Sequence, residues 1–157
     1  MKSHLIGAGF VLIATVGWVG AADAADPTAP SGVMLNDAMA VEKSLTGAPG
    51  DVAAGREWFV NRKLGNCLAC HQNTDLAEEP FHGEVGPTLN GAGDRWKPAQ
   101  LRAIVVNPKK VFGDQTIMPA FYRDGGGTRV GKKFQGKTIL SAQQVEDVIA
   151  YVSTLKE

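Results

Sequence analysis

The chain has 157 residues, of which 44% are apolar, 20% charged and 7% aromatic. This composition fits one ordinary globular domain and excludes a disordered tail, an integral membrane protein and a multi-domain machine. Lys and Arg together number 16, as do Asp and Glu, so the net charge is zero and no overall charge field attracts nucleic acid or an anionic bilayer. With 19 glycines and few aromatic residues, we expect that something besides side chains fills the interior.

The N-terminus has the pattern of a secretory signal peptide. Lys2 gives a short basic start, residues 5–20 form an apolar run, and residues 22–24 supply the small-x-small pattern of a signal peptidase site. The alternative is a retained membrane anchor, but the run is shorter than the roughly 20 apolar residues that span a bilayer. The sequence therefore predicts that residues 1–24 are cleaved, that the mature chain has no membrane span, and that it is exported to an oxidising compartment.

The mature chain is expected to consist of an extension and one domain. Residues 25–50 are dotted with Pro, Gly and Ala and contain one short helical segment, at 36–44. Residues 51–157 carry the periodic apolar segments, and no internal repeat is visible in the sequence. The predicted organisation is a cleaved signal peptide, an N-terminal extension and a single domain.

The first helix of the domain is expected to begin after Asp51, a favourable N-cap residue. Gly55 costs helix stability unless another backbone approaches there, so we expect a helix crossing at this residue. A second helix is expected over 99–106, where apolar residues recur at helical spacing. It ends at Asn107 because a residue that precedes a proline avoids the helical region.

A terminal helix is expected to follow Ser141, which has the spacing of a capping box with Gln144. The apolar residues that follow at helical spacing are Val145, Val148, Ile149, Val152 and Leu155. One weak strand is expected over 134–140, and long loops with Gly and Pro over 72–97 and 109–138. A compact domain tolerates such loops when they surround something.

Cys67, Cys70 and His71 form the most informative motif of the chain, a Cys-x-x-Cys-His pentapeptide. On a helical turn, positions i, i+3 and i+4 share a face, so the two sulfurs and the imidazole lie together. The spacing is typical of covalent haem c attachment, in which the cysteines form thioethers with the porphyrin and His71 is the proximal iron ligand. Two alternatives remain open: a redox dithiol without its usual strand–helix surroundings, and structural zinc, for which the mature chain offers only these three residues and His82.

The second axial ligand is sought among the other histidine and methionines of the mature chain, namely His82, Met34, Met39 and Met118. His82 is only 11 residues beyond His71, too near for the chain to wrap around the ring, and is expected to be a loop residue. Met34 and Met39 lie in the extension. Met118 lies 47 residues beyond His71 and precedes a proline that stiffens its loop. We therefore expect Met118 as the distal ligand, and the alternative is a core-filling role.

Three further features accompany the motif. The Pro87 carbonyl is a candidate acceptor for the free ring N–H of His71, a bond that fixes the tautomer and tunes the metal, and the alternative is that residues 86–89 form only a turn. Arg95 and Trp96 are candidate donors to the haem propionates, and the alternative is an ordinary exposed arginine beside a half-buried tryptophan. The segment 123–137 has five basic residues against one acidic residue, and it either steers an acidic partner or is a solvated face.

With these motifs, residues 51–157 resemble the SoxX cytochrome family of the bacterial sulfur-oxidation system. The resemblance rests on residues 65–71 (GNCLACH), 81–87 (FHGEVGP), 116–123 (TIMPAFYR) and 134–140 (FQGKTIL) running into 141–151. It implies an all-α fold of the class I cytochrome c type, a helical domain with long loops wrapped around one covalent haem c. In this family Cys67 and Cys70 would be the tethers, His71 the proximal ligand and Met118 the distal ligand.

The resemblance also implies a periplasmic electron-transfer subunit that pairs with the SoxA cytochrome. In that family the pair is an L-cysteine S-thiosulfotransferase that oxidatively couples thiosulfate to a cysteine of SoxY in the SoxYZ carrier, and electrons pass to a downstream cytochrome c. Because thioethers would use both cysteines of the chain, it has no catalytic cysteine of its own. The alternatives are a free-standing periplasmic cytochrome c shuttle and a haem-free redox or metal-binding protein.

Overall fold

The computed structural model describes residues 26–124 and 130–157, and all regular structure in these ranges is helical. The α-helices and 3-10 helices (η) in chain order are η1 (Pro30–Gly32), α1 (Val52–Val60), η2 (Cys67–Ala69), η3 (Thr74–Leu76), α2 (Ala92–Arg95), α3 (Pro98–Val106), α4 (Pro108–Phe112), η4 (Lys132–Phe134) and α5 (Ala142–Val152). The described ranges contain no β-strand, which confirms the predicted all-α class. The predicted signal peptide, residues 1–24, lies outside them. None of the helices within them is long and apolar enough to cross a membrane.

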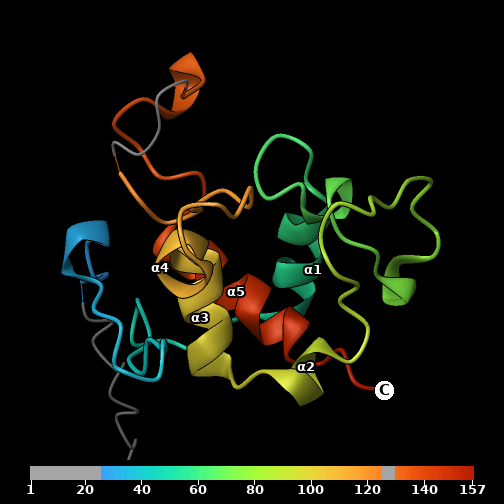
Figure 1. The fold of residues 1–157 in the computed structure, drawn as a ribbon, viewed down its shortest axis with the longest axis horizontal. Helices are drawn as coiled ribbons and strands as arrows, with labels where there is room; N and C mark the ends of the chain where they lie inside the picture. Colours follow the sequence, from blue (N-terminus) through green and yellow to red (C-terminus); the bar gives the residue numbers. More distant parts are fainter. Residues whose placement is uncertain (1–25, 125–129) are drawn as a thin grey trace, which may run out of the picture.

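Helices α1 and α5, near the two ends of the domain, cross with their backbones in contact (Figure 1). The Asp51 side chain caps α1 as predicted, accepting a hydrogen bond from the Ala54 N–H at 2.8 Å. A Cβ atom at Gly55 would lie 1.9 Å from the carbonyl oxygen of Asp147 in α5. The predicted crossing at Gly55 is therefore confirmed, because only glycine allows the two helices to approach this closely.

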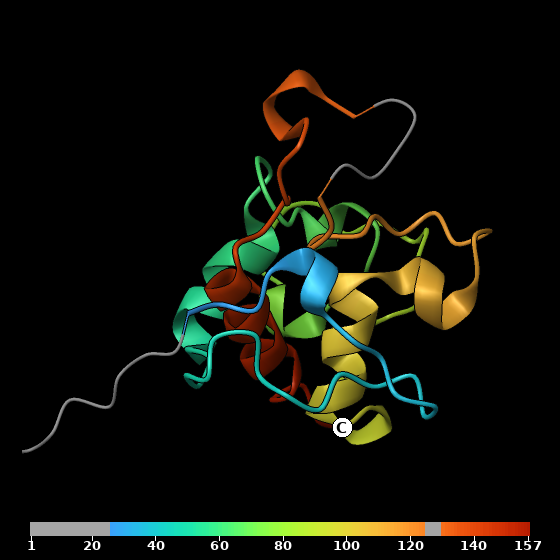
Figure 2. The same cartoon turned by 90° about the vertical axis from the view of Figure 1, so that its left-hand side faces the viewer.

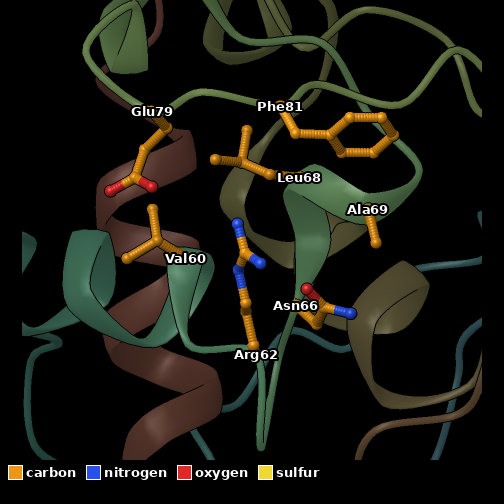
Figure 3. Close-up of a pocket in the computed structure, with 7 residues that line it drawn as sticks. All are labelled: Val60, Arg62, Asn66, Leu68, Ala69, Glu79 and Phe81. Carbon is orange, nitrogen blue, oxygen red and sulfur yellow. The ribbon is translucent and has the colours of Figure 1, made fainter.

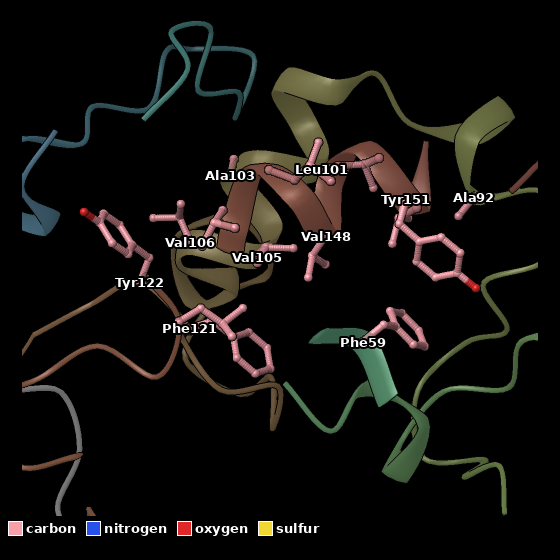
Figure 4. Packing of buried hydrophobic residues seen from close by; sticks show 14 of the residues in the cluster. Phe59, Ala92, Leu101, Ala103, Val105, Val106, Phe121, Tyr122, Val148 and Tyr151 are labelled. Atoms are coloured by element: carbon pink, nitrogen blue, oxygen red, sulfur yellow. The ribbon is translucent and has the colours of Figure 1, made fainter. Parts of the chain in front are cut away.

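The apolar face of α5 packs into the core together with α1 and α3 (Figure 4). Its predicted capping box is present: Ser141 Oγ accepts from the Gln144 N–H at 3.2 Å, and Gln144 Oε1 accepts from the Ser141 N–H at 2.8 Å. The Tyr151 ring meets Phe59 edge to face, with 5.5 Å between centroids. The helix ends three residues before Leu155, which is nonetheless buried. The end of α5 is therefore held by core packing beyond its last turn.

A change of backbone direction at Asn107, where φ is −155°, separates α3 from α4. α3 ends at Val106, as the following proline predicts. Pro108 then begins α4, because its fixed φ suits the first position of a helix. The sequence pattern predicts only loops over 72–97 and 109–138. In the structure, 72–97 contains η3 and α2, and 109–138 contains η4 and all of α4 except Pro108.

The helix predicted over 36–44 is absent, and this prediction is wrong. The side-chain oxygen of Asn36 accepts from the N–H groups of Ala38 and Ala40, each at 3.0 Å, and these bonds fold the chain into a turn. Met39 has a left-handed φ of 53°, which a continuous helix does not contain. Local side-chain bonds from asparagine therefore replace the helical ladder here.

The weak strand predicted over 134–140 is also wrong. The N–H groups of Ile139 and Leu140 both donate to the single carbonyl of Phe121, each at 3.0 Å, instead of to successive residues of a partner strand. Gly136, with a φ of 66°, turns the chain within the segment. Ile139 and Leu140, at the end of the segment, are thus held by the Phe121 carbonyl rather than by pairing with a strand.

The segment 26–50 packs against the domain through a buried ion pair. Arg102 of α3 and Glu146 of α5 meet at 2.8 and 2.9 Å, and their side chains are 10% and 4% exposed. The same two side chains hold the segment, since Arg102 donates to the Val41 carbonyl at 2.7 Å and Glu146 accepts from the Leu45 N–H at 2.8 Å. Figure 2 shows the segment running across the face formed by α3 and α5. The described part of the extension is therefore a structured layer of the fold.

Candidate functional site

The Cys-x-x-Cys-His motif lies on one tight turn that follows α1. The N–H groups of Cys70 and His71 both donate to the Cys67 carbonyl, at 3.1 and 3.0 Å, in and just after η2. Asn66 precedes the turn with a left-handed φ of 49°. The two cysteines are not joined in a disulfide. The turn therefore presents two cysteine sulfurs and an imidazole within five residues, as the spacing predicts.

The ring of His71 is oriented by a hydrogen bond from the chain on its other side. Its Nδ1 lies 2.7 Å from the carbonyl oxygen of Pro87. Because a carbonyl only accepts, Nδ1 carries a proton, and in the neutral ring the lone pair is then on Nε2. A Cβ atom at Gly86 would lie 2.4 Å from the ring carbon Cε1, so the backbone there lies directly against the imidazole. The predicted bond between His71 and Pro87 is confirmed, and it leaves Nε2 as the nitrogen able to bind a metal.

The same loop covers the motif turn with its backbone. The Gly83 N–H donates to the Leu68 carbonyl at 2.7 Å, and the Gly86 N–H donates to the Cys70 carbonyl at 2.8 Å. A Cβ atom at Gly83 would lie 2.1 Å from the carbonyl oxygen of Ala69, so no other residue fits there. The sequence predicts that the run 86–89 passes close to His71, and this is confirmed, but sequence reasoning missed Gly83, which the Gly-x-x-Gly-Pro run could have indicated.

His82 is held in the loop by both of its ring nitrogens. Nδ1 accepts from the Asn73 N–H at 3.2 Å, and Nε2 donates to the Leu76 carbonyl at 3.0 Å. Neither nitrogen is left to bind a metal, which agrees with the expected loop role.

Met118 lies half-buried against the hydrophobic core, on the loop that follows α4. Lys109 of α4 holds this loop, because its amine donates to the carbonyl oxygens of Thr116 and Met118, the latter at 3.4 Å. Met34 and Met39 are instead 79% and 48% exposed. Of the three methionines in the described ranges, only Met118 packs against the core. Sequence reasoning missed Lys109, since its role depends on the unpredicted helix α4.

The surroundings of the thiols disfavour the two haem-free alternatives. Burial raises the pKa of the Cys67 thiol to about 12, whereas a redox dithiol needs a thiolate near neutral pH. Among the described residues, no group of three or more His, Cys, Asp and Glu side chains is arranged to hold a metal ion. Two cysteines outside any disulfide, an imidazole oriented through Nδ1 and a half-buried thioether instead fit the donor set of a covalent haem.

The two candidate propionate donors make other contacts. Arg95 donates to the carbonyls of Thr88 and Asn90, at 2.9 and 2.5 Å, and so holds the turn between them. The Trp96 ring packs edge to face against Phe112, with 6.3 Å between centroids. Contacts from Arg95 and Trp96 to haem propionates stay a prediction.

The basic segment 123–137 is described except for residues 125–129. Its part after the gap stands away from the helices in both overall views (Figures 1 and 2). Lys133 donates to the Lys63 carbonyl at 2.9 Å, which ties the segment to the chain just before the motif turn. The described basic side chains of the segment are exposed and form no ion pair with other described residues. Attraction of an acidic partner stays a prediction.

A pocket of about 210 Å³ lies beside the motif turn but apart from the four candidate side chains (Figure 3). In Figure 3, Arg62 extends between Val60 and Asn66. The full lining is Val60, Arg62, Asn66, Leu68, Ala69, Glu79 and Phe81. None of the side chains of Cys67, Cys70, His71 and Met118 lines this pocket, so it is a separate hollow beside the turn.

Comparisons with known proteins agree with this geometry. The cytochrome c family matches residues 52–156. A chain in the crystal structure of SoxXA from P. pantotrophus is 49% identical, with a TM-score of 0.76, and the match covers 83% of this chain and 99% of that chain. No curated protein sequence matches. The chain therefore belongs to the cytochrome c family and, within it, to the SoxX electron-transfer cytochromes, which carry covalently bound haem c.

Proposed function

We propose that this chain is the electron-accepting subunit of a periplasmic SoxAX complex, which couples thiosulfate to a cysteine of SoxY in the SoxYZ carrier. The likeness to a chain of SoxXA, at 49% identity over 83% of this chain, supports SoxA as the partner. The observation that carries the proposal is the motif turn with its imidazole oriented by Pro87. The signal-peptide pattern of residues 1–24 supports the periplasmic location.

Each candidate residue has a distinct role in this proposal. Cys67 and Cys70 would form the two thioethers to the haem, and His71, through Nε2, and Met118 would hold its iron. When bound, the haem supplies one-electron redox chemistry between its ferrous and ferric states. Iron held by a thioether as well as an imidazole would favour the ferrous state and have a raised reduction potential, which suits an electron acceptor.

The division of labour with SoxA follows from the cysteine count. Joining the outer sulfur of thiosulfate to the SoxY cysteine forms one S–S bond and releases a proton and two electrons. This chain has two cysteines, and the proposal uses both for thioethers, so neither remains to react with sulfur. The sulfur-transferring group therefore belongs to SoxA, and this chain passes the two electrons, one at a time, to a downstream cytochrome c.

The test is purification of the tagged, exported chain together with SoxA, followed by addition of thiosulfate and reduced SoxYZ. We expect a stable complex whose haem is reduced only when both substrates are present. SoxYZ with its SoxY cysteine alkylated is the control and should leave the haem oxidised. A coloured chain that purifies without SoxA and does not respond to the substrates would favour the free-standing shuttle, and a colourless chain would contradict the proposal.

A further inference from the structure

The hydroxyl of Tyr151, near the end of α5, lies inside the fold and bonds to two side chains of the loop that follows His71. The residue is 2% exposed. Its hydroxyl donates to Asp75 Oδ2 at 2.7 Å and accepts from Asn73 Nδ2 at 2.9 Å. Burial, and then the bond to Asp75, raise the pKa of Tyr151 above its ordinary value, so the hydroxyl stays protonated and both bonds persist.

Asn73 passes this anchorage to the backbone just after His71. It is 1% exposed, and its backbone N–H, its side-chain nitrogen and its side-chain oxygen all form hydrogen bonds. Its Oδ1 accepts from the Asp75 N–H at 3.1 Å, and its own N–H donates to His82 Nδ1 at 3.2 Å. A buried amide with all these bonds has one orientation, because an unpaired polar group there would cost free energy. The segment two residues beyond His71 is therefore fixed to α5.

The fixed segment in turn holds the turn that contains the acceptor of the His71 proton. The Leu89 N–H donates to the Gln72 carbonyl at 2.9 Å, and Thr88 Oγ1 donates to the same carbonyl at 3.3 Å. Asn90 Oδ1 accepts from the N–H of Thr74 at 2.9 Å and from its hydroxyl at 3.1 Å. These four bonds join residues 72–74 to residues 88–90, which directly follow Pro87.

We propose that Tyr151 is a positioning residue for His71: through Asn73 and residues 72–74 it fixes the turn whose Pro87 carbonyl accepts the Nδ1 proton. The proposal rests on the proposed function in that His71 is the iron ligand. A strong bond at Nδ1 makes the imidazole a better electron donor and favours the ferric state. Loosening the bond therefore raises the reduction potential, although Tyr151 does not touch the iron ligands.

The experiment compares Tyr151→Phe with Tyr122→Phe in the full-length, haem-loaded protein. Tyr122 is the matched control, because it is also buried and its hydroxyl donates at 2.8 Å to the Thr28 carbonyl, away from this loop. Two quantities are measured: the hydrogen-exchange rate of the His71 ring N–H by NMR in the ferrous protein, and the midpoint potential. We expect exchange roughly three- to tenfold faster in Tyr151→Phe, the factor that one lost hydrogen bond produces, together with a raised potential. Tyr122→Phe should match the wild type in both.

A second variant, Asn90→Ala, breaks the same connection at the surface and does not depend on how well the core tolerates phenylalanine. It should change exchange and potential in the same direction as Tyr151→Phe. Wild-type values in both variants, or equal changes in Tyr122→Phe, would overturn the positioning role. A His71→Ala protein that keeps the wild-type haem spectrum would instead contradict the proposed ligand, and the exchange rate would still decide whether Tyr151 controls the ring N–H.

Discussion

Gly55 in α1 and Asp147 in α5 are in backbone contact: a Cβ atom on the glycine would lie 1.9 Å from the aspartate carbonyl oxygen. The side chain of Asp147 adds to the same junction, since it accepts from the Asp51 N–H at 2.9 Å and from Trp58 Nε1 at 3.2 Å. One residue of α5 therefore holds both ends of α1 while its backbone touches the middle. This junction closes the domain and supports the motif turn that follows α1.

Gly55→Ala is expected to destabilise the fold although alanine is the better helix former. The added methyl group meets backbone that cannot move aside, and overpacking of this kind costs about 1–3 kcal/mol. Thermal unfolding measures the change, and Gly131→Ala is the control because a Cβ there would meet nothing within 4 Å. An unchanged melting temperature in Gly55→Ala would show that the two helices separate more easily than the contact implies.

Glu146→Gln is expected to lower the free energy of unfolding by about 3–5 kcal/mol, because it leaves the Arg102 guanidinium buried without its counter-charge. The pair also binds the extension through Val41 and Leu45, so proteolysis of that segment should accelerate. Asp94→Asn is the control, since the bond between Asp94 and Lys156 is exposed and should contribute little. Equal effects from the two substitutions, measured by denaturant unfolding, would contradict the clamping role of Glu146.

Met118→Ala is expected to abolish the far-red absorption band that arises from a bond between methionine sulfur and haem iron, and to lower the reduction potential. Optical spectra of the oxidised protein and a redox titration check both effects. Met34→Ala is the control, because this methionine is 79% exposed. An unchanged spectrum in Met118→Ala would move the distal ligand to another residue.

Lys109→Met is expected to weaken the same band without removing the methionine. The substitution keeps an unbranched side chain, one atom shorter, but deletes the amine that donates to the Thr116 and Met118 carbonyls. Because hydrogen bonds from a charged donor contribute about 1.5–3 kcal/mol, the fraction of protein with Met118 detached should rise about tenfold or more. Lys110→Met is the control, since the Lys110 side chain is exposed and only its backbone N–H is bonded, to the Asn107 carbonyl at 3.0 Å. The measurement is the intensity of the methionine–iron absorption band as the protein is heated. If Lys109→Met and Lys110→Met lose this band at the same temperature, Lys109 does not hold the loop.

Replacing Cys67 or Cys70 by alanine is expected to leave one thioether, so that part of the haem becomes extractable by acid acetone. The double variant should release all of it. Haem content of the protein after extraction is the measurement, and His71→Ala, which keeps both thiols, is the control that should retain its haem. Full retention in the double variant would contradict covalent attachment through these two sulfurs.

Much of the fold was predictable because the signals are local. Asp51 and Ser141 cap their helices as predicted, and Pro108 ends α3 at the expected residue. Gly55 predicted a helix crossing because glycine within an amphipathic helix needs a packing reason. The wrong predictions, at 36–44 and 134–140, lie where a few polar or tertiary bonds outweigh weak propensity.

Some functional residues could likewise be identified from the sequence, and others only from the structure. The sequence alone determined the haem-binding motif and the candidate ligands, because the chemistry of Cys67, Cys70, His71 and Met118 depends on residue type and spacing. Only the tertiary structure decided how these groups are held, by Lys109 and by the connection from Tyr151, since those bonds join segments that are far apart in the chain or lie on a helix the pattern does not predict. Such contacts depend on how the helices pack, and no local pattern of residues encodes that packing.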